Sequence, residues 1–467
     1  MYSISSGKRQ ILKDRKTLHL TTVTLILITF VTTFFPRIIA AAGAPSAINF
    51  LHFLIAPFAL FVAIRKTRTK DRTQIAISWE LITACVLLLG VMVASAFLNK
   101  AGEINIFLNY MILVEPFLVL LTIICIPLSK ENYQKIRAWL LVSCVINLFT
   151  AFIQKPLIDT GMIPRLPYTP EDAVQGVFYL SGAGNYVSCS ISLAVALYYF
   201  FNAKTAPIWQ RIFWILAAFY QVLISDSKQI LLTFFVAWLL LLFTKFNNLS
   251  KTLTYAISFI LVLVVFIWAV QNLDLPGLDA IKYWAGRTHL YGPNGQAVNS
   301  KLAGIRIVIS HFQSPLNWFL GIGPGHTIGR LGGWVMRDYQ SMLVALGATI
   351  HPASIETWNA LQNDWLVQES SLFIPMFSWA GIWGDLGFLG LGVYLYLSYI
   401  VWTRIAKDDF SRFNLMTLFV YGWIITQMEE PAQTMVIAIM IGLQWHERRI
   451  AKHERLLSMQ SALDVDN

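Results

Sequence analysis

Residues 106–128 read IFLNYMILVEPFLVLLTIICIPL, and this stretch decides the class of fold. It exceeds the roughly 20 apolar residues that a helix needs to cross a hydrocarbon core of about 30 Å. Soluble domains carry about 25% charged residues, whereas this chain is 13% charged and 56% hydrophobic. We therefore expect an all-α polytopic membrane protein.

Similar apolar runs extend outward from this stretch and predict about 12 transmembrane helices. The expected spans lie near residues 18–40, 46–64, 77–98, 104–128, 134–154, 176–202, 207–225, 228–244, 252–270, 376–402, 412–428 and 431–446. The first follows a basic segment without a nearby small-residue cleavage site, so we interpret it as a retained helix. The expected division is residues 1–270 for the first nine spans, 271–371 for one large loop, 372–446 for the last three spans and 447–467 for a tail.

The basic residues sort between the two sides of this arrangement. Most of the 35 Lys and Arg residues fall in the termini and in connections on the same side as the N-terminus. Because cytoplasmic loops carry an excess of Lys and Arg, we expect both termini inside and the large loop outside. The net charge of +10 is then explained by attraction to anionic membrane lipid, so no nucleic-acid partner is expected.

The large loop contains the most informative segment, GIRIVISHFQSPLNWFLGIGPGH at residues 304–326. A loop this long and this aromatic is typical of a functional region, and we expect it to form short amphipathic helices at the membrane surface. The turn with Gly321, Gly323 and Gly325 would let backbone N–H groups approach an anionic oxygen. The alternative is a flexible turn without a ligand.

Metal-binding patterns are weak in this sequence. There is no HExxH and no Walker loop, and the Asp464-x-Asp466 pair lies at the end of the tail, where chance explains it. The cysteines fall inside apolar spans and are expected to be small packing residues; they are Cys85, Cys125, Cys144 and Cys189. We expect neither a metal nor a cofactor.

Three features together resemble the bacterial O-antigen polymerase and ligase superfamily. Ser227-Lys228 opens a mid-chain helix, Arg306 precedes the glycine turn, and a helix containing Asp385, Gly387 and Gly390 follows. The layout of twelve spans with one large outer loop is also similar. The resemblance implies a metal-independent glycosyltransferase of the bacterial inner membrane, working at its periplasmic face.

The same resemblance implies a donor glycan on a polyprenyl diphosphate, whose leaving group must be stabilised by cations. Arginine suits phosphate oxygens because of its bidentate fork. Arg306 is the first choice, with Arg287, Arg330, Lys228 and Arg37 as further diphosphate-binding candidates. For Lys228 the alternative is an interfacial lysine paired with Asp226.

The resemblance also implies a base that activates the acceptor hydroxyl. The histidine of the family's ligases is missing here, since no histidine lies between Glu369 and Gly390. Glu369 and His326 are the base candidates, with a helix-start carboxylate and an ordinary surface histidine as the alternatives. Arg165 precedes Gly176 with a spacing described for family polymerases and is a candidate glycan contact, together with Gly321, Gly323 and Gly325.

These implications favour a polymerase of lipid-linked oligosaccharide repeats, with a chain-length regulator as a candidate partner. A ligase transferring glycan to lipid A core is the first alternative. A transporter or flippase for a lipid-linked glycan is the second, and its main support is Glu115, a carboxylate in the middle of a span. Because polar chemistry gathers in one outer loop, we favour an enzyme acting at one face.

Overall fold

The computed structural model describes residues 22–67, 69, 71–165, 169–245, 249–273, 282, 286–292, 295–369 and 371–465. Within these ranges the chain is helical and contains no strand. Seven helices are long and apolar enough to cross a membrane, at Ser46–Lys66, Arg72–Asn99, Glu103–Cys125, Lys130–Asp159, Gly184–Asn202, Thr252–Asn272 and Ser378–Ile405. The expectation of an α-helical membrane protein is confirmed. The basic residues at 8–16 and Asp466 lie outside the described residues.

These long segments correspond to labelled helices. They are η1 (Ser46–Phe50) with α3 (His52–Lys66), α4 (Arg72–Asn99), α5 (Glu103–Cys125), α6 (Lys130–Asp159), α7 (Gly184–Asn202), α10 (Leu249–Asn272), and α18 (Ser378–Ile400) with the π-helical turn η6 (Val401–Ile405). The other expected spans coincide with helices that are shorter or more polar. These are Thr22–Phe34, α8 (Ile208–Ile224), α9 (Lys228–Phe243), α19 (Asp409–Ile424) and the first part of α20 (Pro431–Val465).

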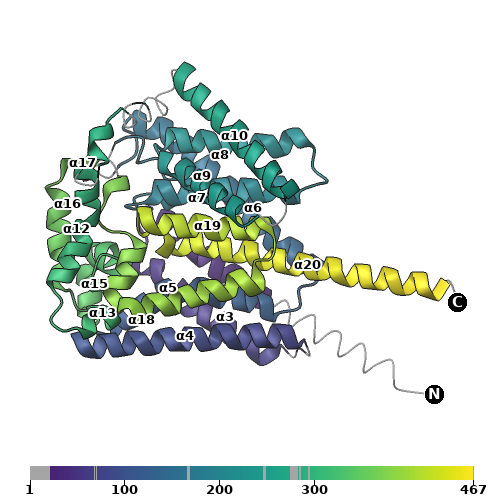
Figure 1. Cartoon of the computed structure of the whole chain (residues 1–467), viewed down its shortest axis with the longest axis horizontal. Coiled ribbons are helices and arrows are strands. Elements are labelled where there is room, and N and C mark those ends of the chain that lie inside the picture. The colour runs from purple at the N-terminus through teal and green to yellow at the C-terminus, as the bar shows by residue number, and fades with distance from the viewer. Residues whose placement is uncertain are drawn as a thin grey trace.

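Helix α5 lies at the centre of the bundle, packed against α3, α4 and α20. Its residues are buried on every side from Met111 to Glu115. This agrees with its sequence, which is apolar all round rather than along one stripe. Helix α10 is the opposite case, because its apolar side chains are exposed and α9 is its main neighbour (Figure 1).

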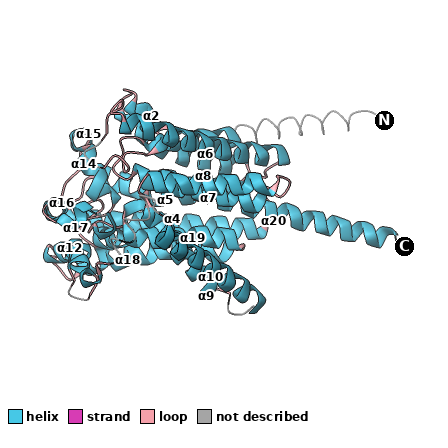
Figure 2. Cartoon of the chain, turned by 90° about the horizontal axis from the view of Figure 1, so that it is seen from above, coloured by secondary structure: helices cyan, strands magenta, loops and turns pink. Residues whose placement is uncertain are grey.

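The short helices of the large loop gather at one end of the bundle, which we call the loop end, and the last part of α20 extends from the other end (Figures 1 and 2). They are η3 (Thr288–Leu290), α12 (Gln296–Ser310), α13 (Leu316–Leu320), η4 (Leu331–Val335), α14 (Met336–Asp338), α15 (Gln340–Ala345), α16 (Pro352–Gln362), α17 (Trp365–Glu369) and η5 (Ser371–Phe373). Two more short elements, α2 (Pro36–Ala41) and η7 (Thr426–Glu429), connect longer helices.

The glycine turn of residues 321–325 lies against a break in α18. Gly387 there has φ of 66°, a left-handed conformation that glycine adopts without strain. The break frees carbonyl groups of α18, and the turn satisfies them, since Ile322 N donates to Gly384 O at 2.9 Å and Gly323 N to Asp385 O at 3.1 Å. Irregular backbone is tolerated inside a membrane protein when its polar groups are paired in this way.

Two expected boundaries are different in the structure. Span six was expected from residue 176, but α7 begins at Gly184, because Gly176 sits in the short turn η2 (Gly176–Phe178). The side chain of Gln154 holds this turn, donating to Gly176 O at 2.8 Å and accepting from Gly176 N at 2.7 Å. At the other end of the chain, α20 continues to Val465, so the expected tail prolongs the last helix.

Candidate active site

A cavity of about 1240 Å³ lies at the loop end, between the bundle and the short helices. Its walls come from segments far apart in sequence. They include α2, the turn before α9, α9 itself, α10, η4, α14, α16 and α17. Charged, aromatic and apolar side chains of the described residues all line this cavity. We therefore take it as the candidate site.

One wall of the cavity is apolar. Leu231, Leu232 and Phe235 come from α9, and Leu263 and Phe266 come from α10. Helix α10 packs mainly on α9 and exposes its other faces. An apolar chain bound along this wall would therefore continue directly into the surrounding lipid.

Four cations also line the cavity: Arg37, Lys228, Arg330 and Arg337. Arg37 is held by Tyr339, because its Nη1 donates to the Tyr339 hydroxyl at 2.7 Å and its guanidinium lies 5.6 Å from the centre of that ring. Among the described residues, no carboxylate lies within 4.0 Å of Arg37. Arg37 is thus the lining cation with donors available to an anion.

Arg330 is buried and is held in place by two neighbouring acidic residues. Its side chain forms an ion pair with the buried carboxylate of Glu430, and its backbone N–H donates to Glu429 Oε2 at 3.0 Å. Burial raises the pKa of Glu429 to about 7. This pair of acidic residues therefore orients Arg330 while leaving part of its guanidinium on the cavity wall.

Arg337 is placed by two tryptophans. Its guanidinium lies 5.1 Å from the centre of the Trp334 ring and 4.1 Å from that of Trp358, and it also pairs with Asp338 at 2.7 Å. Stacking of this kind holds a guanidinium in a fixed plane at modest energetic gain. Both tryptophans line the cavity, as does Tyr291.

The cavity also contains carboxylates, and most of them are engaged. Lys228 pairs with Asp226, as the alternative reading of that lysine supposes. Glu369 is exposed and its Oε2 lies 3.3 Å from Arg287 Nη1. Asp172 accepts hydrogen bonds from Thr169 and Asn185, and burial raises its pKa.

The structure brings together Arg37, Lys228, Arg330 and Glu369 from the sequence-based candidates. Arg287 lies next to the cavity through its contact with Glu369. Six further candidates do not line the cavity, namely Arg306, His326, Arg165, Gly321, Gly323 and Gly325.

Arg306 lies on the exposed face of α12, a helix that contributes no residue to the cavity. The buried face of α12 is formed by Ala297, Ser300, Gly304 and Val308. Arg306 is two residues from Gly304, which places it about 200° around the helix, on the opposite face. Its side chain is exposed and donates to Asn299 O at 2.6 Å.

His326 is buried, with both ring nitrogens bonded. Nδ1 lies 2.9 Å from Ile322 O and Nε2 lies 2.8 Å from Thr349 Oγ1, and burial lowers the pKa of the imidazole. Arg165 is exposed in the segment between α6 and η2. Gly176, its spacing partner, packs against Asn147 and Ser188.

The glycine turn does receive an anionic oxygen, but one from the chain itself. Asp385 accepts from Gly325 N at 2.8 Å, from Thr327 N at 2.9 Å and from Thr327 Oγ1 at 2.6 Å. Asn109 adds a fourth hydrogen bond at 2.9 Å. A Cβ at Gly321 would overlap the backbone of Asp385, so this glycine is needed for the close approach.

Sequence reasoning missed Arg337, Tyr339 and the Glu429-Glu430 pair. The pair had a readable signal, since two adjacent carboxylates between apolar runs are expensive unless they have partners. Tyr339 carried no such signal, because an isolated tyrosine in an aromatic loop is common. In the described part of the chain, no group of His, Cys, Asp and Glu side chains could hold a metal ion.

No family model matches this chain, and a search of curated proteins finds no match to it. The geometry of the cavity and the motifs quoted above therefore carry the functional argument.

Proposed function

We propose that the protein is a membrane glycosyltransferase that polymerises oligosaccharide repeats carried on a polyprenyl diphosphate. The observation that carries this proposal is the composition of a single cavity. It is lined by four cations from three segments, namely α2, the start of α9 and the stretch from Arg330 to α14, and by an apolar wall from α9 and α10. An amphiphile with an anionic head group and a long hydrocarbon chain fits both parts.

Each part of such a substrate meets a matching surface. The diphosphate suits Arg37 and Arg330, because guanidinium groups bind phosphate oxygens through paired N–H donors. The polyprenyl chain suits the wall formed by α9 and α10. The sugars suit Tyr291, Trp334 and Trp358, whose rings can stack on the apolar faces of a pyranose.

The reaction joins two such substrates. A hydroxyl oxygen of the acceptor glycan forms a bond to the anomeric carbon of the donor, and the bond from that carbon to the diphosphate oxygen breaks. The diphosphate leaves with the electron pair, and the hydroxyl proton passes to a base. Cations held in a fixed geometry stabilise the charge that develops on the leaving group.

The proposed arrangement in the membrane follows from the sorting of basic residues. Twelve spans place both termini in the cytoplasm and residues 271–371 in the periplasm of a bacterial cell. The short helices and the last part of α20 lie at opposite ends of the bundle, which supports this arrangement.

The test is the surface polysaccharide of cells that lack the protein, separated on gels after complementation with wild type, Arg37→Ala or Arg404→Ala. Arg404 is a matched control, because it is an exposed arginine paired with Glu80 outside the cavity. We expect wild type and Arg404→Ala to restore a ladder of repeats. Loss of an anion-stabilising donor lowers rates by about 10²–10³-fold, so Arg37→Ala should leave one repeat on its anchor at normal protein levels.

Other outcomes would identify the rival functions. Long polymer that remains on its polyprenyl carrier in the deletion strain would show a ligase. Single lipid-linked repeats held at the cytoplasmic face would show a flippase, and the enzyme proposal would fall.

A further inference from the structure

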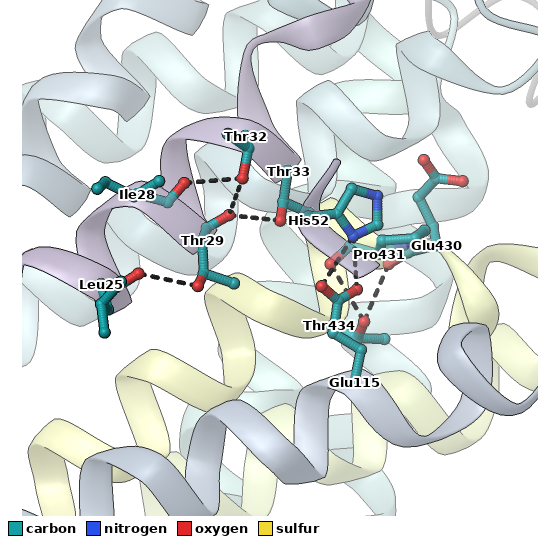
Figure 3. A network of polar contacts seen from close by, with 10 residues as sticks. All are labelled: Leu25, Ile28, Thr29, Thr32, Thr33, His52, Glu115, Glu430, Pro431 and Thr434. Atoms are coloured by element: carbon teal, nitrogen blue, oxygen red, sulfur yellow. Dashed lines mark hydrogen bonds and ion pairs between the residues drawn. The ribbon is translucent and has the colours of Figure 1, made fainter. Parts of the chain in front are cut away.

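A buried histidine and glutamate pair lies behind the cavity. His52 begins α3 and Glu115 lies in the middle of α5. His52 Nδ1 is 2.8 Å from both carboxylate oxygens of Glu115, and both side chains are buried. Figure 3 shows the imidazole ring above the carboxylate, with Glu430 and Thr434 of the neighbouring segment close by.

The second ring nitrogen of His52 is directed away from Glu115 (Figure 3). Among the described residues, Nε2 has no hydrogen-bond partner, because both bonds of this ring involve Nδ1. The carboxylate favours the tautomer in which Nδ1 carries the proton, so Nε2 presents a lone pair. A carboxylate that orients an imidazole in this way also stabilises the imidazolium formed when Nε2 accepts a proton.

A second, smaller cavity of about 40 Å³ adjoins this histidine. His52 lines it together with Asn49 and Glu430, and four lining residues also line the large cavity: Arg37, Arg330, Val335 and Tyr339. Because a water molecule needs roughly 10–15 Å³ of such space and polar partners, this volume is enough for two or three waters. The histidine therefore lines a small space that contains the polar side chains of Asn49 and Glu430 and shares four lining residues with the candidate site.

We propose that the His52–Glu115 pair is the proton acceptor of the transfer reaction, reached through water in the small cavity. This inference rests on the proposed glycosyltransferase function. When the acceptor oxygen attacks the anomeric carbon, its proton passes to water, and that water gives a proton to His52 Nε2. The imidazolium is neutralised by Glu115, and the departing diphosphate keeps the electron pair of the broken bond.

The other base candidates are engaged elsewhere. His326 uses both ring nitrogens in hydrogen bonds, and Glu369 is exposed beside Arg287. His52 has a free nitrogen and a carboxylate partner, and it lies close to the two arginines expected to hold the diphosphate. The titratable and charged groups around the shared space are Glu115 from α5, Glu430 before α20, Arg330 before η4, Arg37 from α2 and Tyr339 after α14.

The experiment measures turnover against pH for protein in nanodiscs, using the lipid-linked repeats extracted from membranes of cells that lack the protein. Wild-type turnover should rise with pH as one group loses its proton, and then level off. His52→Gln and Glu115→Gln should lower turnover by about 10²–10⁴-fold, and His52→Gln should lose the acidic limb of the profile. Ser143→Ala is the control, since Ser143 is a buried polar residue of α6 that lines neither cavity.

Binding of undecaprenyl diphosphate distinguishes failure of the proposed function from failure of the proton-acceptor inference. If wild type fails to bind it saturably, the proposed function falls. If wild type and His52→Gln both bind it and both turn over substrate at the same rate with the same pH profile, the proton-acceptor inference falls and the function stands. If His52→Gln does not fold, Glu115→Gln decides, because turnover by that variant at the wild-type rate contradicts the inference.

Discussion

The glycine turn and the large cavity both present positively polarised groups to an anion, but they differ in where the anion comes from. At the turn, backbone N–H groups of Gly325 and Thr327 surround the carboxylate of Asp385, which belongs to the chain. At the cavity, Arg37 is held by the hydroxyl of Tyr339 and faces open space. The first arrangement is complete, whereas the second can accept a ligand.

This difference teaches that a glycine-rich turn and an exposed cation are not equivalent signals of an anion site. The turn sits beside the break in α18 at Gly387, and its contacts hold the loop end on the bundle. Its glycines are required for close packing. The arginines at the cavity have no such structural use for all of their donors, so they are the better candidates for substrate binding.

The largest expected effect in this comparison is the loss of stability on removing the internal anion. Asp385→Ala leaves the N–H groups of Gly325 and Thr327 and the amide of Asn109 buried without an acceptor. We expect the free energy of unfolding in mixed micelles to fall by about 3–5 kcal/mol, the usual cost of breaking a buried charged network. Denaturation followed by tryptophan fluorescence measures it.

Glu80→Ala is the matched control, because it removes a carboxylate from a more exposed ion pair with Arg404. Such pairs contribute about 0–1 kcal/mol. An equal loss for the two variants would mean that Asp385 has no special part in holding the turn. Folded Asp385→Ala protein should still bind undecaprenyl diphosphate, since Asp385 does not line the large cavity.

A smaller effect on stability is expected from Glu429, a second buried carboxylate, which accepts fewer hydrogen bonds than Asp385. Burial raises the pKa of Glu429 to about 7 from its usual 4.5. Between these two pH values the folded protein keeps a proton that the unfolded chain has lost, so stability should fall as pH rises from 4.5 to 7. The expected loss is about 3 kcal/mol at most, and it should be flat outside this window.

Unfolding of wild type and Glu429→Gln at a series of pH values measures this contribution. The amide does not titrate, so the difference in unfolding free energy between the two proteins isolates Glu429. A difference that is constant from pH 4 to 8 would show that the carboxyl is not protonated in the folded state at neutral pH.

The smallest expected effect concerns Arg306. Its side chain is exposed on the far face of α12 and bonds to Asn299. Arg306→Ala should therefore change stability by less than about 0.5 kcal/mol and leave the polysaccharide ladder intact. Loss of the ladder at normal protein levels would show that Arg306 takes part in the reaction, as the sequence motif predicted, despite its exposed position on α12.

Most of the fold could be predicted from the sequence, because long apolar runs have few alternatives to a membrane helix. The exceptions have local causes. Gly387 interrupts α18 only because the turn after α13 supplies donors to the freed carbonyls. Gln154 similarly delays the start of the expected sixth span by bonding to Gly176. Both are contacts between distant segments, which periodicity does not reveal.

The candidate site could be predicted only in part. Arg37 and Lys228 stood out as cations in apolar surroundings, Arg330 was a candidate as an arginine of the large loop, and all three line the cavity. Choosing among loop arginines required the orientation of α12, which depends on what the helix packs against. Glu115 was a visible anomaly, but its partner His52 begins a different helix, 63 residues away.

Equilibrium binding of undecaprenyl diphosphate to the purified protein in nanodiscs tests the central claim most directly. Wild type should bind saturably, and Arg37→Ala should bind about 10–100-fold more weakly, as expected for loss of one charge-assisted contact to phosphate. Arg404→Ala should bind like wild type. Equal affinity for wild type and Arg37→Ala, or no saturable binding by wild type, would contradict the assignment of the cavity to a lipid-linked diphosphate.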